Sequence, residues 1–224
     1  MPQTSSAITD SRRRLRETRA RDDFYATVEP TKRMDLFLSL CIGIGLSAAC
    51  GFRIFVPLLV MSIAAKSGHL TLVSNFQWIG SDIALITFAI ATCLEIAAYY
   101  IPWLDHALDV IATPAAIVAG TIVTASMVGG MSPFLKWTLA VIAGGGAAGL
   151  VQGATVVTRG ASTVSTAGFA NPLLATIELG GSVVTSVLSI IAPVVAIIFL
   201  TAILFYVGKK LLPKFLRTRR GAGG

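Results

Sequence analysis

Few charged side chains lie in the long apolar middle of the chain, and their chemistry is the most informative. Of 18 Lys/Arg and 11 Asp/Glu residues, residues 1–35 hold eight basic and six acidic ones, and residues 208–224 hold six basic ones. Residues 36–207 therefore hold four basic and five acidic residues. A charged group at the bilayer centre costs about 2.5–3.5 kcal/mol on insertion scales. Each such group therefore indicates either a functional role or an ion pair.

Arg53 and Glu95 are the first two of these groups. Arg53 lies between Gly51 and Pro57 in an apolar run. At the start of a half-helix, its guanidinium can attract an anion or a substrate. A structural ion pair with a carboxylate of another helix is the alternative. Glu95 lies in an apolar segment that ends before Pro102. It is a proton- or cation-coupling carboxylate, the partner of Arg53, or an interfacial group.

A second polar group frames a segment without any charge between its ends. Arg159 and Glu178 bound it, and Asn171 lies within it among Gly, Ser and Thr residues. These side chains either line a hydrated path for a small solute or satisfy backbone groups freed by a helix break. The predicted substrate or ion path comprises Arg53, Glu95, Arg159, Asn171 and Glu178.

Asp105 and Asp109 are four residues apart and share one helix face. With Glu95 they would supply the oxygen ligands that hard cations prefer. The alternative is that Asp105 caps the N-terminus of a helix and both acids favour its dipole. The identity of any metal is open.

Signatures of enzymes are missing from the sequence. There is no Gly-rich phosphate loop, no Gly-x-Ser-x-Gly and no His-Glu-x-x-His, and the chain has two histidines. The three cysteines lie in apolar runs and are expected to pack as small hydrophobic residues. We therefore expect neither enzymatic activity nor a cofactor.

The elements that position these groups are transmembrane helices. The chain is 54% hydrophobic and 13% charged, against about 25% charged in soluble domains. The composition predicts an all-α, polytopic helical bundle with about five to six spans, two of its helices interrupted. The expected segments are half-helices 36–50 and 54–65, a polar connection 66–79, spans 79–101, 107–131 and 134–157, an interrupted segment 159–178 and a span 180–207.

Three regions follow: a basic and acidic tail (1–35), a transmembrane domain (36–207) and a basic tail (208–224). Because basic tails stay in the cytoplasm, both termini are predicted to be cytoplasmic, which requires an even number of crossings. Six crossings satisfy this; alternatively, one broken segment is a hairpin that does not cross. The echo between Gly51-Phe52…Pro57 and Gly168-Phe169…Pro172 raises the further interpretation of an inverted repeat.

The expected surroundings follow from this topology. The partners are the lipid bilayer of the cytoplasmic (inner) membrane and anionic lipid headgroups at the basic tails. Faces of small residues such as Gly144 to Gly149 allow close helix packing or a homo-oligomer. The net charge of +7 is explained by the two tails, so nucleic acid is not an expected partner.

Several motifs together resemble a known family. They are the run Gly43 to Leu58, Leu94-Glu95-Ile96, Pro102 to Asp109 with Thr113-Pro114, and Asn171-Pro172 ahead of Glu178. The chain resembles, over about residues 36–207, bacterial multi-pass membrane proteins catalogued as a domain of unknown function. The resemblance implies no activity. It implies only that Arg53, Glu95, Asp105, Asp109, Arg159, Asn171 and Glu178 form one constellation.

The function expected from these residues is a small transporter or channel for a small ion or polar solute. Two charged, Gly- and Pro-broken segments in an otherwise almost uncharged domain favour it. A non-transporting membrane scaffold or assembly factor is the first alternative, and lipid transport is the second.

Overall fold

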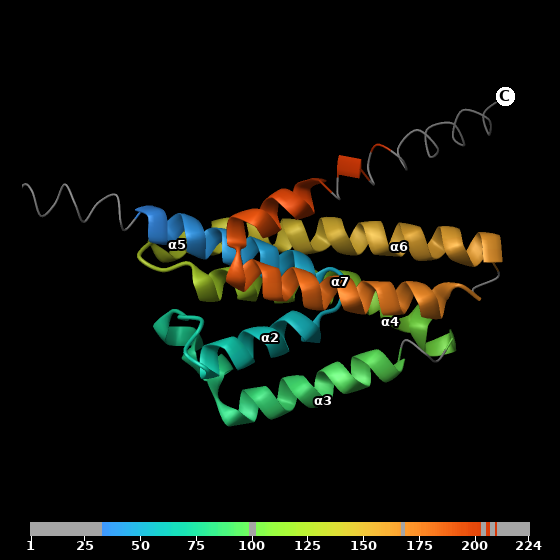
Figure 1. Ribbon diagram of the computed structural model, residues 1–224, viewed down its shortest axis with the longest axis horizontal. Coiled ribbons are helices and arrows are strands. Elements are labelled where there is room, and N and C mark those ends of the chain that lie inside the picture. Colours follow the sequence, from blue (N-terminus) through green and yellow to red (C-terminus); the bar gives the residue numbers. More distant parts are fainter. Residues whose placement is uncertain (1–32, 99–101, 167–168, 203–204, 207–208, 210–224) are drawn as a thin grey trace, which may run out of the picture. The chain divides into compact units, whose positions relative to one another are not determined.

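The computed structural model describes residues 33–98, 102–166, 169–202, 205–206 and 209, with the side chains of residues 102–110 outside the description. The chain divides into two compact units, residues 1–38 and 39–224, and the packing below concerns the second. All regular elements of the described residues are helices, so the predicted all-α class is confirmed (Figure 1).

The described elements follow one another with short connections. In chain order they are a helix Arg33–Cys50, α2 (Phe55–Lys66), the 3₁₀ helix η1 (Ser74–Gly80), α3 (Asp82–Ala98), α4 (Pro102–Met127), α5 (Pro133–Leu139), the π-helix η2 (Ala140–Gly145), α6 (Gly146–Thr166) and α7 (Asn171–Ile191), then a helix Pro193–Ala202.

The helices present apolar side chains outward. On α3 the exposed residues Ile83, Ile86, Ile90 and Leu94 recur at helical spacing. Among the described residues, three helices are long and apolar enough to cross a membrane, or four if η1 and α3, bent by 61°, form one span. These apolar helices are consistent with an integral membrane protein and imply contact with the lipid bilayer.

The first broken segment is a hairpin, which we call the first hairpin (residues 39–66). Its outgoing arm packs along α4, because a Cβ at Gly43 would lie 3.4 Å from Met127 Cβ and Ser47 Oγ donates to the Gly120 carbonyl (2.6 Å). After the break, α2 returns, and Ser126 Oγ contacts Met61 Sδ at 3.7 Å. Both arms therefore meet the last turn of α4.

This geometry corrects the prediction of two half-helices in one crossing. α2 has 12 residues and is about 18 Å long, too short for a hydrocarbon core of about 30 Å. The two arms run in opposite directions, as the alternative of a hairpin requires, and the helix Arg33–Cys50 is by itself long and apolar enough to cross a membrane. The tip of the first hairpin, residues 51–54, lies eight residues or about 12 Å beyond Gly43, well inside the bundle.

The second broken segment is also a hairpin, formed by α6 and α7, and we call it the second hairpin. The predicted interruption between Arg159 and Glu178 falls between Thr166, where α6 ends, and Asn171, where α7 begins. The predicted spans 134–157 and 180–207 have wrong ends. The helix from Pro133 continues to Thr166. α7 begins earlier and stops at Ile191, ahead of Pro193.

The two hairpins point in the same direction. A Cβ at Gly144 would lie 2.5 Å from the Gly120 carbonyl, and one at Gly149 would lie 3.2 Å from Ile117. α6 therefore runs away from the Met127 end of α4, as the outgoing arm of the first hairpin does. An inverted repeat needs opposite directions, so that interpretation is wrong for these two segments.

The connection between α2 and α3, predicted to be polar, contains apolar side chains that are buried. Leu70, Leu72 and Ile79 are buried. Val73 N–H donates to the Ser126 carbonyl (2.9 Å), and Ser62 Oγ donates to the Ile79 carbonyl (2.6 Å). These bonds hold the connection against α2 and α4 at the open end of the first hairpin.

The contact of α4 with η2 depends on backbone proximity. At Gly144 an added Cβ would overlap Thr124 Oγ1 and approach the Gly120 carbonyl oxygen to 2.5 Å, whereas at Gly146 it would meet nothing within 4 Å. Close approach of helices through glycine is typical of membrane bundles.

Gly144→Ala is expected to lower the free energy of unfolding by about 1–3 kcal/mol, because the backbone of Gly120 cannot move away cheaply. The matched control Gly146→Ala should be neutral or stabilising by up to about 1 kcal/mol. Thermal unfolding in detergent, followed by tryptophan fluorescence, measures both. Equal effects of the two substitutions would contradict this packing.

Cysteine labelling tests the first hairpin. In a chain with Cys41, Cys50 and Cys93 replaced, Ser39→Cys and Ser67→Cys, at the two open ends of the first hairpin, should react with a membrane-impermeant maleimide from the same side. Phe169→Cys, in the turn of the second hairpin, should react from the opposite side. Labelling of positions 39 and 67 from opposite sides would show that the first segment crosses the membrane.

Candidate functional site

Glu95 satisfies the backbone where α2 begins inside the bundle. Its Oε1 accepts the N–H of Ile54 (2.7 Å) and its Oε2 accepts the N–H of Phe55 (3.1 Å). Pro57, in the same first turn, has no N–H to satisfy. The carboxylate also lies at the positive end of the helix dipole. Glu95 of α3 therefore caps α2, a role that the sequence analysis did not include.

The carbonyl groups on the other side of the break are satisfied too. The Ala48 carbonyl accepts from Gly51 N–H (3.0 Å), and the Ala49 carbonyl accepts from Phe52 and Arg53 N–H (both 3.1 Å). Ser182 Oγ of α7 donates to the Ala49 carbonyl as well (3.1 Å). The break is thus held by α3 from one side and by α7 from the other.

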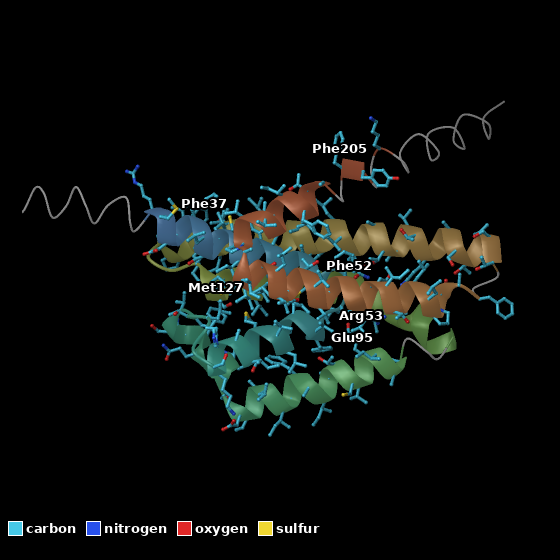
Figure 2. The ribbon with its side chains drawn as sticks, viewed as in Figure 1. Phe37, Phe52, Arg53, Glu95, Met127 and Phe205 are labelled. Carbon is cyan, nitrogen blue, oxygen red and sulfur yellow. The ribbon has the colours of Figure 1, made fainter. Side chains whose placement is uncertain are left out.

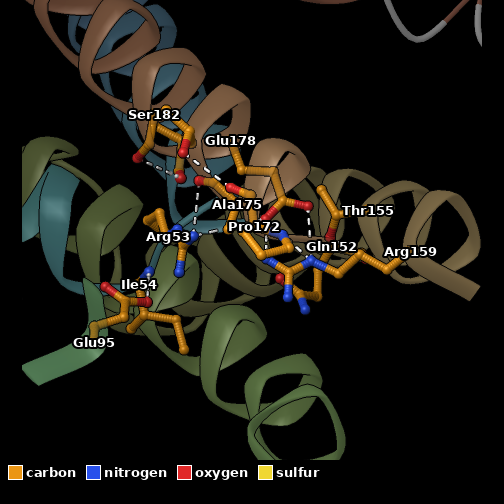
Figure 3. A network of polar contacts seen from close by, with 12 residues as sticks. Arg53, Ile54, Glu95, Gln152, Thr155, Arg159, Pro172, Ala175, Glu178 and Ser182 are labelled. Atoms are coloured by element: carbon orange, nitrogen blue, oxygen red, sulfur yellow. Dashed lines mark hydrogen bonds and ion pairs between the residues drawn. The ribbon is translucent and has the colours of Figure 1, made fainter. Parts of the chain in front are cut away.

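Arg53 extends from this tip toward the second hairpin. Its side chain is 2% exposed. Nη2 donates to the Ala175 carbonyl of α7 (2.8 Å) and lies 4.0 Å from Glu178 Oε2, which is an ion pair beyond hydrogen-bond distance. Figure 2 shows Arg53 and Glu95 near one another. Figure 3 shows Arg53 between Glu95 and the α7 residues Ala175 and Glu178.

Arg159 and Glu178 form the tight pair of the site. Arg159 Nε donates to Glu178 Oε1 (2.9 Å) and Oε2 (3.1 Å), and Nη2 makes a further short ion pair with Oε2. Both residues are buried. Glu178 is therefore committed mainly to Arg159, which reaches it from α6 (Figure 3).

Asn171 lies near this cluster at the start of α7. Its Nδ2 donates to Thr163 Oγ1 (3.2 Å), and that hydroxyl donates to the Arg159 carbonyl (3.0 Å). Asn171 is 8% exposed, and its Oδ1 accepts no hydrogen bond from the residues that the structure describes. A buried oxygen of this kind is suited to a ligand or a water molecule.

A polar stripe runs along the buried side of α7. Its members recur every three or four residues and are mostly Ser, Thr or charged: Asn171, Ala175, Glu178, Ser182, Thr185, Ser186 and Ser189. It covers 19 residues, from Asn171 to Ser189, whose 18 steps span about 27 Å, close to the thickness of the hydrocarbon core. The sequence analysis missed its serines, although their spacing is visible in the sequence.

The stripe is closed beyond Ser182 by close packing. Ser186 Oγ donates to the Ser182 carbonyl (2.7 Å) and Ser189 Oγ to the Thr185 carbonyl (2.6 Å). A Cβ at Gly45 would overlap Ser189 Oγ. The half of the stripe near Asn171 instead contains Glu178, which pairs with Arg159.

The structure therefore brings the predicted path residues into one region. Arg53, Arg159 and Glu178 form a cluster, which we call the charge cluster. Glu95 accepts the N–H groups of the two residues that follow Arg53. Asn171 lies one helical turn before Ala175, whose carbonyl accepts from Arg53. The side chains of Asp105 and Asp109 lie outside the described residues, so the predicted cation site stays a prediction. No group of three or more metal-ligating side chains occurs among the described residues.

Glu95→Ala is expected to lower the free energy of unfolding by about 2–4 kcal/mol, because it leaves two buried N–H groups of α2 without an acceptor. Glu95→Gln keeps one acceptor oxygen and should lose less. Asp82→Asn is the matched control on α3, where Asp82 pairs with Lys66 at an exposed position, and it should change stability by less than about 1 kcal/mol. Thermal unfolding of the four proteins decides; similar losses for Glu95→Ala and Asp82→Asn would refute the cap.

Comparison with known proteins adds the family. Residues 40–210 match the family described as Domain of unknown function (DUF4126). No curated protein and no solved structure matches the chain. The matched region contains both hairpins and the charge cluster. The chain belongs to the DUF4126 family.

Proposed function

We propose that this protein is a small membrane transporter or channel whose path follows the polar stripe of α7 past the charge cluster. The observation that carries the proposal is the convergence of Arg53, Arg159 and Glu178 beside a helix break inside the bundle. Broken helices with charged groups near mid-membrane are typical of transporter binding sites.

The geometry of α7 supports a path rather than an ordinary packing face. Its outward residues Leu173, Ile177 and Ile191 are apolar and exposed, while its inward residues from Asn171 to Ser182, before the closely packed part of the stripe, are mostly polar over about 17 Å. In a bilayer, polar groups that face the interior of a helix bundle often line the route of a polar solute.

The charge cluster is also a weak stabiliser. Replacing a buried ion triad by apolar side chains is often neutral or stabilising. The cluster lies between the first hairpin, α6 and α7, where apolar side chains could pack these helices at least as stably as charges. The presence of charges there favours a role for them in moving a solute over a role in a scaffold.

A swelling assay tests the proposal. Proteoliposomes are shrunk by hyperosmotic potassium chloride with valinomycin, which carries K⁺ so that an anion path suffices, or by potassium acetate with a protonophore, so that a cation path suffices, or by glycerol or urea, and their recovery is followed by light scattering. Wild-type protein should accelerate recovery for at least one solute relative to empty vesicles. Arg53→Gln should reduce the accelerated rate at least about tenfold, equivalent to ~1.4 kcal/mol in the barrier.

The matched control is the double variant Lys66→Gln/Asp82→Asn, which removes an exposed ion pair and should keep the rate within about twofold. Recovery equal to that of empty vesicles for every solute, with folded wild-type protein, would contradict the transporter or channel. A scaffold or a lipid transporter would then be the better hypothesis.

A further inference from the structure

We infer that proton binding to Glu95 releases the tip of the first hairpin and thereby opens the path, with Thr92 as the acceptor that receives the protonated side chain. The part of this inference that concerns flux rests on the proposed function. The inference is drawn from the two hydrogen bonds of the Glu95 cap, from a buried hydroxyl on α3 without a partner, and from the charges around them.

The cap depends on the charge of Glu95. As a carboxylate, Glu95 accepts the N–H groups of Ile54 (2.7 Å) and Phe55 (3.1 Å), one at each oxygen (Figure 3). A proton from the aqueous phase that binds one oxygen turns it into a hydroxyl donor, and no other covalent bond changes. The neutral side chain keeps one carbonyl oxygen as an acceptor. One N–H group at the start of α2 therefore loses its acceptor, and the tip is held less firmly.

Thr92 lies one helical turn before Glu95 on α3. It is 7% exposed, and its Oγ1 has no hydrogen-bond partner among the described residues. Thr87 on the same helix shows the usual arrangement, because its hydroxyl donates to the Ile83 carbonyl (2.7 Å). Helix side chains lean toward the N-terminus, so the Glu95 carboxyl can reach the turn of Thr92. The O–H of a protonated Glu95 needs an acceptor, and Thr92 Oγ1 supplies it.

The charged groups around Glu95 are few. Arg53 and Cys50 are the titratable side chains whose charge acts on it. Of the elements packed on α3, η1 has no titratable residue, and α2 has only Lys66, which pairs with Asp82 at the opposite end of α3. The side chains of three titratable residues of α4 lie outside the described residues: Asp105, His106 and Asp109. Within the described part of the chain, Glu95 makes no hydrogen bond or ion pair beyond those given above.

Hydrogen exchange of the wild-type protein in lipid nanodiscs tests the release. Protection factors of the Ile54 and Phe55 amides, corrected for the intrinsic effect of pH, are measured from about pH 8 to about pH 4, the range in which carboxyl groups titrate. Protection of at least one amide should fall about tenfold on acidification, as the loss of one hydrogen bond requires. The Val73 amide, which donates to the Ser126 carbonyl (2.9 Å), is the internal control and should keep its protection. Equal changes at all three amides, or none at Ile54 and Phe55, would overturn the inference.

Infrared spectroscopy identifies the group that takes the proton. Acidification should produce the carbonyl stretch of a protonated carboxyl, and this band should be missing in Glu95→Gln. In Thr92→Val the acid loses its acceptor, so the band should move to higher frequency and its midpoint should fall by about one pH unit. The matched control Thr87→Val removes an exposed hydroxyl of α3 and should change neither value. The same band and midpoint in Thr92→Val and wild type would refute Thr92 as the acceptor.

Flux measurements connect the release to the proposed function. For a solute that the swelling assay identifies, the wild-type rate should rise about tenfold on acidification, in parallel with the loss of protection. Glu95→Gln, which also has one acceptor oxygen, should transport at the high rate at every pH. A rate that does not follow the protection of Ile54 and Phe55 would overturn the coupling and leave the transporter standing. No flux of any solute at any pH, with the change in protection present, would overturn the proposed function and leave the proton-released tip.

Discussion

The architecture depends on one constraint: a helix that ends inside a bilayer must have its free N–H and C=O groups satisfied by protein. The first hairpin ends one helix at Cys50 and starts another at Phe55. Glu95 accepts two of the N–H groups, and Ser182 donates to one of the carbonyls. α3 and α7 are thereby held at the tip. The position of Arg53 follows from the positions of α3 and α7, because Arg53 belongs to the turn that both helices contact.

The break also explains how two arginines come to share one carboxylate. Arg53 is carried inward by the first hairpin, and Arg159 and Glu178 face one another across the second hairpin. Since Arg159 takes the short contacts with Glu178, Arg53 is left at a greater distance and donates instead to the backbone of α7. The two arginines thus contact Glu178 unequally: Arg159 by short hydrogen bonds, Arg53 by a longer ion pair of 4.0 Å.

The sequence predicted the helical class, the two broken segments and the residues of the charge cluster, because charge, proline and glycine are rare in apolar segments and therefore conspicuous. It did not determine the direction of the chain after each break. The residues around Gly51 suit a half-helix that continues and one that turns back equally well. The choice depends on contacts of Gly43 and Met61 with α4, which are far apart in the chain. The end of α7 at Ile191 was missed although Pro193 marks it.

The π-helix η2 has a consequence for how the chain tolerates changes in length. Its six residues, Ala140–Gly145, join α5 to α6 without interrupting the helix. A π-turn accommodates one residue more than an α-turn. In an α-helix, each residue advances by about 100° around the helix axis. Deleting one residue here would restore a regular α-helix and leave the faces of α6 nearly unchanged relative to α5. Deleting one residue from the regular helix between Gly146 and Arg159 would instead turn Arg159 by about 100° around the helix axis, away from Glu178. η2 is therefore the place in this helix where a change of one residue leaves the charge cluster in register.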